Sequence, residues 1–196
     1  LFRSPGSFFR GAADKIQVIY QGCHPAFKQV YTQDSREAVR RKYGLPGRFL
    51  LSVGTIEPRK NLLTAVKSLL YHPLPLVVVG RETDYAKKVR DYIVQQGLQN
   101  RVHFLSNVSM EDLAMIYQSA TVFCYLSIFE GFGIPVIEAL YSRVPVITSL
   151  GGCFSEAGGP GSFYIDSTDG EMLAGRINAL LQDAGLYQQV TGKGWE

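Results

Sequence analysis

The chain has 196 residues, of which 46% are hydrophobic and 19% charged, with a formal net charge of +3. These values exclude an intrinsically disordered chain, which requires low hydrophobicity and a large charge imbalance. Three cysteines without a CxxC pair and three histidines in separate segments favour neither a disulfide framework nor a zinc site. We therefore expect no bound metal.

Membrane insertion and nucleic-acid binding are also not indicated. The longest apolar runs are less than half of the ~20 residues that span a bilayer, and the N-terminal segment lacks a signal-peptide core, so a cytoplasmic location is expected. The basic clusters at residues 40–42 and 87–88 are typical of solvated helix faces, so we expect no nucleic-acid partner. The modest basic charge leaves a peripheral membrane contact open.

The N-terminal region divides into two parts. Residues 1–15 mix Gly, Pro, Ser and Phe without periodicity, and are interpreted as a linker from an upstream domain. Residues 16–196 are expected to form one domain, beginning with the apolar strand 16–20. A short helix is predicted over residues 35–44, with Ser35 as a possible N-cap and Gly44 as its end.

Strands and helices then alternate along the chain. Apolar runs predict strands, and apolar residues recurring at intervals of three and four predict helices. The expected strands cover residues 48–54, 75–80, 102–105, 121–126, 144–148 and 162–165. The expected helices cover residues 61–70, 84–97, 109–120, 134–142 and 169–181, followed by another helix-like stretch. Continuous apolar strands are buried on both faces, which predicts a doubly wound α/β domain with a parallel sheet.

The loop after strand 48–54 carries a basic pair. Gly54 ends the strand, and Arg59 and Lys60 lie just before the next helix begins. Basic residues oppose the helix dipole at that position, so a structural role alone explains them poorly. Since ligands of open parallel sheets bind beyond the carboxyl ends of the strands, a diphosphate is the expected partner of these cations.

The loop after strand 121–126 carries two acidic residues in the pattern E-x7-E. Glu130 lies in the loop, and Glu138 lies about one turn into the following helix among apolar neighbours. Carboxylates of this kind can accept hydrogen bonds from sugar hydroxyls. The segment Gly131, Phe132 and Gly133 between them offers backbone amides, and its glycines permit close approach of a ligand.

Together, FEGFGIPVIEALYSRVPVITS, SVGTIEPRKNL and RVHFLSNVSMEDLAMIYQSA resemble the C-terminal domain of family 4 glycosyltransferases, which are retaining enzymes of the GT-B fold. The resemblance implies that the chain is a single Rossmann-like domain. It also implies that Glu138 binds the ribose, that Glu130 contacts the donor sugar, and that Arg59 and Lys60 bind the diphosphate. Thr55 stands where the family often has an arginine, which leaves the diphosphate to the latter two residues.

Other expectations follow from the same resemblance. Phe104 and Leu105 would flank the nucleobase, and a missing N-terminal domain would bind a glycan or lipid-linked acceptor. A nucleotide-diphospho-sugar, GDP-mannose before a UDP-sugar, would be the donor, and no metal or other cofactor would be needed because no DxD-like pair is present to hold one. A non-catalytic nucleotide-sugar-binding or assembly module is the alternative. An NAD-dependent dehydrogenase is disfavoured because no GxGxxG follows the first strand.

Overall fold

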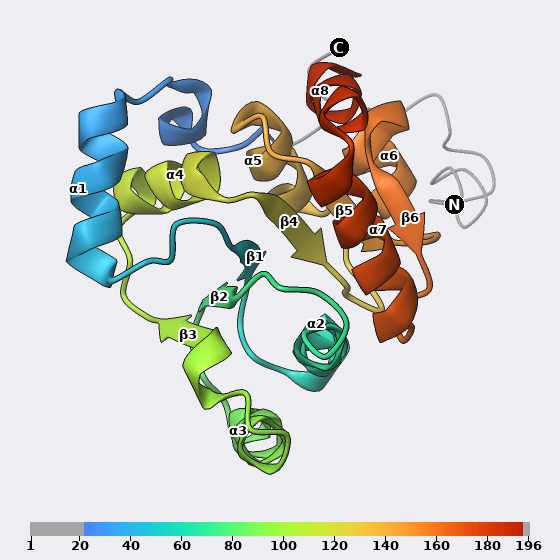
Figure 1. The fold of residues 1–196 in the computed structure, drawn as a ribbon. Helices are drawn as coiled ribbons and strands as arrows, with labels where there is room; N and C mark the ends of the chain where they lie inside the picture. Colours follow the sequence, from blue (N-terminus) through green and yellow to red (C-terminus); the bar gives the residue numbers. More distant parts are fainter. Residues whose placement is uncertain (1–21, 194–196) are drawn as a thin grey trace, which may run out of the picture.

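The computed structural model describes residues 22–193. The predicted linker over residues 1–15 and the predicted strand over residues 16–20 lie outside this range. Within it, the alternation of strands and helices read from the sequence is present (Figure 1).

Six strands form one sheet in the order β3-β2-β1-β4-β5-β6, and every neighbouring pair is parallel. The chain runs outward from β1 to β3, returns to the centre, and runs outward again from β4 to β6, so the predicted doubly wound α/β class is confirmed. The strands are β1 (Leu50–Val53), β2 (Leu76–Val79), β3 (Val102–Leu105), β4 (Val122–Tyr125), β5 (Val146–Ser149) and β6 (Phe163–Ile165).

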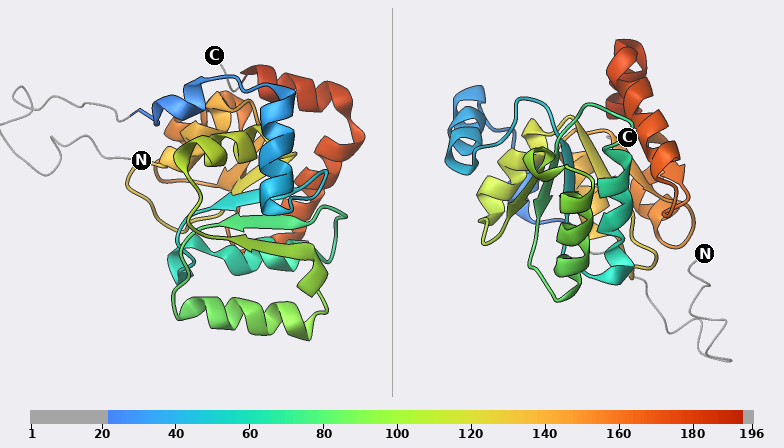
Figure 2. Two further views of the ribbon diagram at one scale, coloured as in Figure 1. Left: turned by 90° about the vertical axis from the view of Figure 1, so that its left-hand side faces the viewer. Right: turned by 60° about the horizontal axis from the view of Figure 1, so that its bottom comes forward.

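Helices cover both faces of the sheet, as Figures 1 and 2 show. One face packs against α1 (Gln33–Tyr43), α4 (Met110–Ser119), α5 (Ile134–Tyr141) and α6 (Phe154–Gly158). The other face packs against α2 (Leu62–Ser68), α3 (Tyr85–Gln95), α7 (Gly170–Gln182) and α8 (Ala184–Lys193). Short 3₁₀ turns occur at η3 (Pro25–Lys28), η4 (Pro58–Lys60), η5 (Gln99–Arg101) and η6 (Gly159–Gly161).

The two cores divide each strand between them. Leu50 and Val78 belong to the core beneath α2, α3 and α7, whereas their neighbours Leu51 and Val77 belong to the core beneath α4 and α5. Because successive strand side chains point to opposite faces, both faces must be apolar when both are covered by helices. This explains the continuous apolar runs in the sequence.

Two local predictions differ from the structure. The first helix is capped by Thr32, not Ser35: the Thr32 hydroxyl accepts a hydrogen bond from the Ser35 amide at 3.2 Å, as an N-cap side chain does. Gly44 ends that helix as predicted, with a φ of 60°. In addition, the sequence predicts no helix within the glycine-rich segment 151–159, which contains α6.

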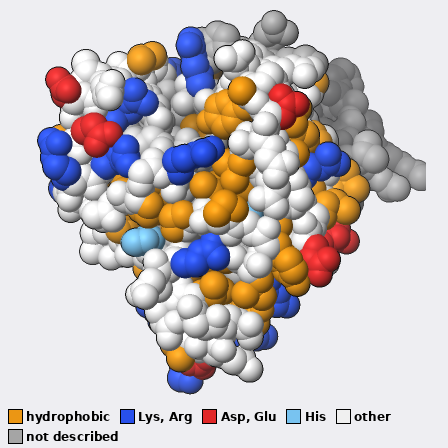
Figure 3. Space-filling view, in the orientation of Figure 1, with side chains coloured by type: hydrophobic (Ala, Val, Ile, Leu, Met, Phe, Trp, Pro, Cys, Tyr) orange, Lys and Arg blue, Asp and Glu red, His pale blue; other side chains and the backbone are white. Residues whose placement is uncertain are grey.

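Large apolar side chains are exposed at several places on the surface. Leu70 and Tyr71 follow α2, while Ile128, Phe129 and Leu150 follow β4 and β5. On the face seen in Figure 1, apolar side chains lie in groups among Lys and Arg side chains (Figure 3). Exposed apolar residues are common on soluble domains. Among residues 22–193, no helix is both long and apolar enough to cross a bilayer.

A buried histidine should make the stability of this fold depend on pH. His72 is buried after α2, its Nε2 lies 3.1 Å from the Ser68 hydroxyl, and burial with the nearby Arg101 charge lowers its pKa to about 4. The unfolded chain therefore binds a proton near pH 6.5 that the folded chain excludes. Stability should fall as pH drops from 6.5 towards 4, by roughly 3 kcal/mol from this group. His72→Gln should remove that part of the dependence in urea unfolding measured against pH, and an unchanged pH dependence would contradict this role.

Candidate functional site

The candidate site lies where the strand order reverses. The loops that leave β1 and β4 diverge to opposite faces of the sheet, and ligands of doubly wound folds bind at such a point. The two loops are tied together: the Ile128 amide donates to the Arg59 carbonyl at 2.8 Å, and Arg59 Nη1 donates to the Phe129 carbonyl at 3.2 Å. The basic pair and the first glutamate, distant in sequence, therefore meet.

Glu130 is the centre of this meeting. Its Oε1 lies 2.6 Å from Lys60 Nζ, 2.7 Å from Arg59 Nη1 and 2.8 Å from the Ser127 hydroxyl. Only 12% of its side chain is exposed. Burial raises the pKa of this carboxyl, but the hydrogen bonds from Lys60, Ser127 and Arg59 outweigh burial, so the pKa lies below its ordinary value. Glu130 is thus held as a carboxylate.

The two cations differ in their surroundings. The Lys60 side chain is 15% exposed, crosses Gly54, and donates to the Tyr125 hydroxyl at 2.5 Å. Arg59 is 47% exposed and also contacts Glu57 at 2.7 Å. The predicted basic pair therefore comes together with Glu130 and Gly54, and two carboxylates balance the two cations.

An open cleft of about 630 Å³ lies beyond the carboxyl ends of β1, β2 and β3. Gly80 lets two of these strands end close together, since a Cβ there would lie 2.0 Å from the Gly54 carbonyl oxygen. Any side chain at position 80 would push the strand ends apart. The cleft is lined by Val53, Gly54, Thr55, Val79, Gly80, Arg81, Glu82, Ser106, Asn107, Val108 and Leu113. A smaller hollow beside it shares residues 53–55 and adds Lys60 and Tyr125, which joins the cleft to the basic pair.

Glu138 lies apart from this cluster. It is buried on α5, and its Oε2 accepts a hydrogen bond from the Tyr117 hydroxyl at 3.1 Å. Burial raises its pKa, while the Tyr117 hydrogen bond and the charge of His24 act in the opposite direction. Among residues 22–193, no hydrogen bond or ion pair joins Glu138 to Glu130. The two predicted carboxylates therefore sit in different local environments.

The loop between the glutamates is constrained at its end. Gly133 has a φ of 85° and precedes the first residue of α5, whose first turn holds Pro135. Cys153 Sγ lies 3.4 Å from the Glu130 carbonyl oxygen, which ties this loop to the segment before α6. The predicted segment Gly131, Phe132 and Gly133 thus connects the Glu130 cluster directly to the helix that carries Glu138.

Phe104 and Leu105 occupy the last positions of β3. The Arg90 guanidinium lies 4.2 Å from the Phe104 ring centroid, and the Leu105 carbonyl accepts from the Gly80 amide at 3.0 Å. Neither is among the residues that line the cleft, whose lining includes Ser106, the residue directly after this strand. Their contact with a base stays a prediction.

Sequence reasoning missed the polar groups that hold the loop after β4. Thr148 Oγ1 donates to the Tyr125 carbonyl at 2.8 Å, and Ser149 Oγ donates to the Ser127 carbonyl at 2.7 Å. Ser127, three residues before Glu130, was also not singled out. Hydroxyls at the end of two neighbouring apolar strands were the available signal, since such groups need hydrogen-bond partners when buried.

Within the described part of the chain, no group of three His, Cys, Asp or Glu side chains is placed to hold a metal ion.

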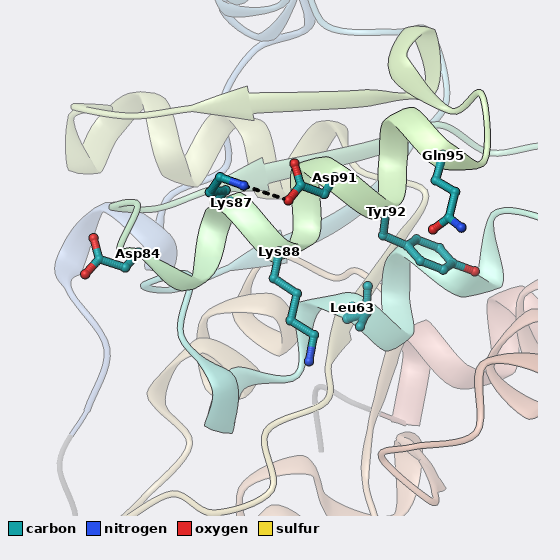
Figure 4. A pocket seen from close by; sticks show the side chains of 7 residues that line it. All are labelled: Leu63, Asp84, Lys87, Lys88, Asp91, Tyr92 and Gln95. Atoms are coloured by element: carbon teal, nitrogen blue, oxygen red, sulfur yellow. Dashed lines mark hydrogen bonds and ion pairs between the residues drawn. The ribbon is translucent and has the colours of Figure 1, made fainter.

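A second hollow lies away from this site, between α2 and α3. It is lined by Leu63, Asp84, Lys87, Lys88, Asp91, Tyr92 and Gln95 (Figure 4). In it, Lys87 pairs with Asp91 at 3.1 Å, and Lys88 extends towards α2.

The backbone of the Glu130 loop supplies a matched pair of variants. A Cβ at Gly133 would meet Ala157 at 3.3 Å and would sit on a left-handed backbone, whereas a Cβ at Gly131 meets nothing within 4 Å. Gly133→Ala should lower the free energy of unfolding by about 1–2 kcal/mol, and Gly131→Ala should change it by less than about 0.5 kcal/mol. Urea unfolding of both variants measures this. Equal stabilities would show that position 133 does not need glycine.

Comparison with known proteins finds similarity to glycosyltransferases. The profile of the family "Glycosyl transferases group 1" matches residues 35–194. O-antigen chain mannosyltransferase RfbU of Salmonella typhimurium is 33% identical over 159 residues, covering 80% of this chain and 42% of RfbU. The chain therefore spans less than half the length of that relative.

Solved structures share the fold. The crystal structure of Anabaena Alr3699/HepE in complex with UDP and glucose has a TM-score of 0.84 at 22% identity, covering 95% of this chain and 53% of HepE. The C-terminal domain of a glycosyl transferase group 1 family protein (LpcC) from Francisella tularensis has a TM-score of 0.72 at 21% identity, covering 86% of this chain and 93% of that domain.

Proposed function

Because the chain belongs to the group 1 glycosyltransferases, we propose that it forms the donor-binding domain of a retaining hexosyltransferase that uses a nucleotide-diphospho-sugar. The observation that carries this proposal is the convergence of Arg59, Lys60 and Glu130 beside the cleft at the sheet's reversal point. That arrangement combines cations for a diphosphate with a carboxylate for a sugar.

The diphosphate is assigned to Arg59 and Lys60. An ammonium group has three N–H donors, and the hydrogen bonds of Lys60 to Tyr125 and Glu130 leave one for a phosphate oxygen. Arg59 is half exposed and can turn its guanidinium to a ligand at the cleft. Positive charge fixed in advance stabilises the negative charge that develops on a leaving nucleoside diphosphate.

The nucleoside is assigned to the cleft and to Glu138. The cleft is lined at the end of β2 and just after β3, where backbone groups would offer donors and acceptors to a base. Glu138 would accept from the ribose hydroxyls, which would compensate the cost of burying this carboxyl. Glu130 would contact the transferred sugar.

We favour GDP-mannose as the donor, with a UDP-sugar as the rival. The relative RfbU is named as a mannosyltransferase, whereas the structural neighbour HepE was solved with UDP and glucose. The acceptor is proposed to be a glycan or a lipid-linked glycan, bound by a further domain outside this chain. A cytoplasmic location, with a possible peripheral membrane contact, would fit such an acceptor.

Nucleotide binding tests the proposal directly. Either GDP or UDP should bind the chain more tightly than ADP, and Lys60→Ala and Glu138→Ala should each weaken that binding about tenfold or more, because each removes a charged hydrogen-bonding group. Titration calorimetry gives the affinities. Lys88→Ala is the matched control, since this exposed lysine lies in the separate hollow of Figure 4.

The outcomes discriminate clearly. Binding that falls in both site variants but not in Lys88→Ala supports the donor-binding role, and the preferred nucleotide identifies the base. Absence of binding to a folded chain, or equal loss in all three variants, contradicts it.

Metal independence is a separate prediction. Arg59 and Lys60 supply the positive charge that a divalent ion provides at other diphosphate sites, so the dissociation constant of the preferred nucleotide should change by less than about threefold between EDTA and millimolar Mg²⁺. Calorimetry in the two buffers at matched ionic strength measures this. A strong requirement for Mg²⁺ would instead mean that the nucleotide brings a metal into the site.

A further inference from the structure

We propose that Tyr125 is a positioning residue that fixes the Lys60 ammonium group for the diphosphate of the donor. This inference rests on the proposed function. It concerns a residue of the strand, not of the two loops that the sequence motifs mark.

Tyr125 meets Lys60 through its hydroxyl, which accepts a hydrogen bond from Lys60 Nζ at 2.5 Å. Lys60 Nζ lies 4.8 Å from the ring centroid, beside the hydroxyl edge of the ring. A hydrogen bond from a charged donor is directed and stronger than one between neutral groups. Together with Gly54, over which the lysine chain passes, these contacts define the path and the end point of the Lys60 side chain.

Tyr125 is itself held rigidly. It is 3% exposed at the end of β4, and its ring lies 6.1 Å from those of Phe123 and Phe154. The row of rings continues through Phe123 to Tyr117, whose hydroxyl binds Glu138. A side chain packed in this way has little freedom to move, so the Tyr125 hydroxyl stays in one place and sets where Lys60 Nζ can form its hydrogen bond.

The Tyr125 hydroxyl also remains a neutral group. Burial and the neighbouring Glu130 carboxylate raise its pKa well above the ordinary value of tyrosine. It can therefore accept from Lys60 without neutralising the ammonium charge, unlike Glu130. Lys60 is thereby fixed in place by one neutral and one charged partner, and keeps an N–H for a ligand.

Tyr125→Phe keeps the ring and removes the hydroxyl. We expect about tenfold weaker binding of the preferred nucleoside diphosphate, GDP or UDP, with unchanged binding of the matching nucleoside, guanosine or uridine, which lacks phosphate. Tyr187→Phe is the matched control, because that hydroxyl donates to the Thr121 carbonyl at 3.1 Å and belongs to α8. A general loss of structure would weaken the nucleoside as well.

A double-variant cycle tests whether Tyr125 acts through Lys60. In a Lys60→Ala background, Tyr125→Phe should cause no further loss of diphosphate affinity, because the group it positions is gone. Additive losses would overturn the positioning role. The positioning role would also be overturned if Tyr125→Phe bound the diphosphate with wild-type affinity while Lys60→Ala bound it more weakly. That result would leave the donor-binding function intact. If the wild-type chain binds neither GDP nor UDP, the proposed function fails and the role of Tyr125 fails with it.

Discussion

The site depends on the ion pairs that Arg59 and Lys60 both make with the Glu130 carboxylate. Its Oε1 meets Lys60, Arg59 and Ser127, so it joins the loop after β1 to the loop after β4. Without that charge, Lys60 would be a mostly buried cation beside apolar and aromatic groups, and Glu57 would be the remaining acidic partner of Arg59 among residues 22–193. A buried charge without a counter-charge is costly, so the loop conformations and the charge balance are coupled.

The sheet order makes this meeting possible. β1 and β4 are neighbours at the point where the strand order reverses, and the helices that follow them, α2 and α5, pack on opposite faces of the sheet, so their loops leave a space between them. The hydroxyls of Thr148 and Ser149 on β5 then hold the end of β4 and the loop that follows it. The strand order provides the space between the two loops, and the buried hydrogen bonds fix the position of the loop that carries Glu130 relative to the basic pair.

Much of this could be predicted from the sequence because it depends on local patterns. Continuous apolar runs and helical periodicity identified the strands and most helices, and the E-x7-E and basic-pair motifs identified four charged residues of interest. The helix over residues 154–158 escaped notice because its five residues lie among glycines, which are poor helix formers. The start at Thr32 was missed because Ser35, an equally good cap by type, lies inside the same helical turn.

The partners of the charged residues could not be predicted in the same way. The pattern E-x7-E places Glu130 and Glu138 close in sequence, yet one joins a charged cluster and the other a tyrosine hydroxyl in the core. The burial of Glu138 depends on how α5 packs over β4. Tyr125 reaches Lys60 only because β1 and β4 are adjacent. These are contacts between segments that are distant in sequence, and short-range periodicity does not predict such contacts.

The charge balance of the site also bears on selectivity. Two carboxylates already neutralise Arg59 and Lys60, so a ligand must offer acceptors at least as good as the Glu130 carboxylate before it gains from meeting them. A diphosphate does so because it carries several charged oxygens, whereas a neutral nucleoside cannot compete. If a diphosphate takes over part of the bonding to the cations, Glu130 gains acceptor capacity for a sugar hydroxyl. Within the proposed function, the same carboxylate thus holds the loops after β1 and β4 together and recognises the sugar once the diphosphate has bound.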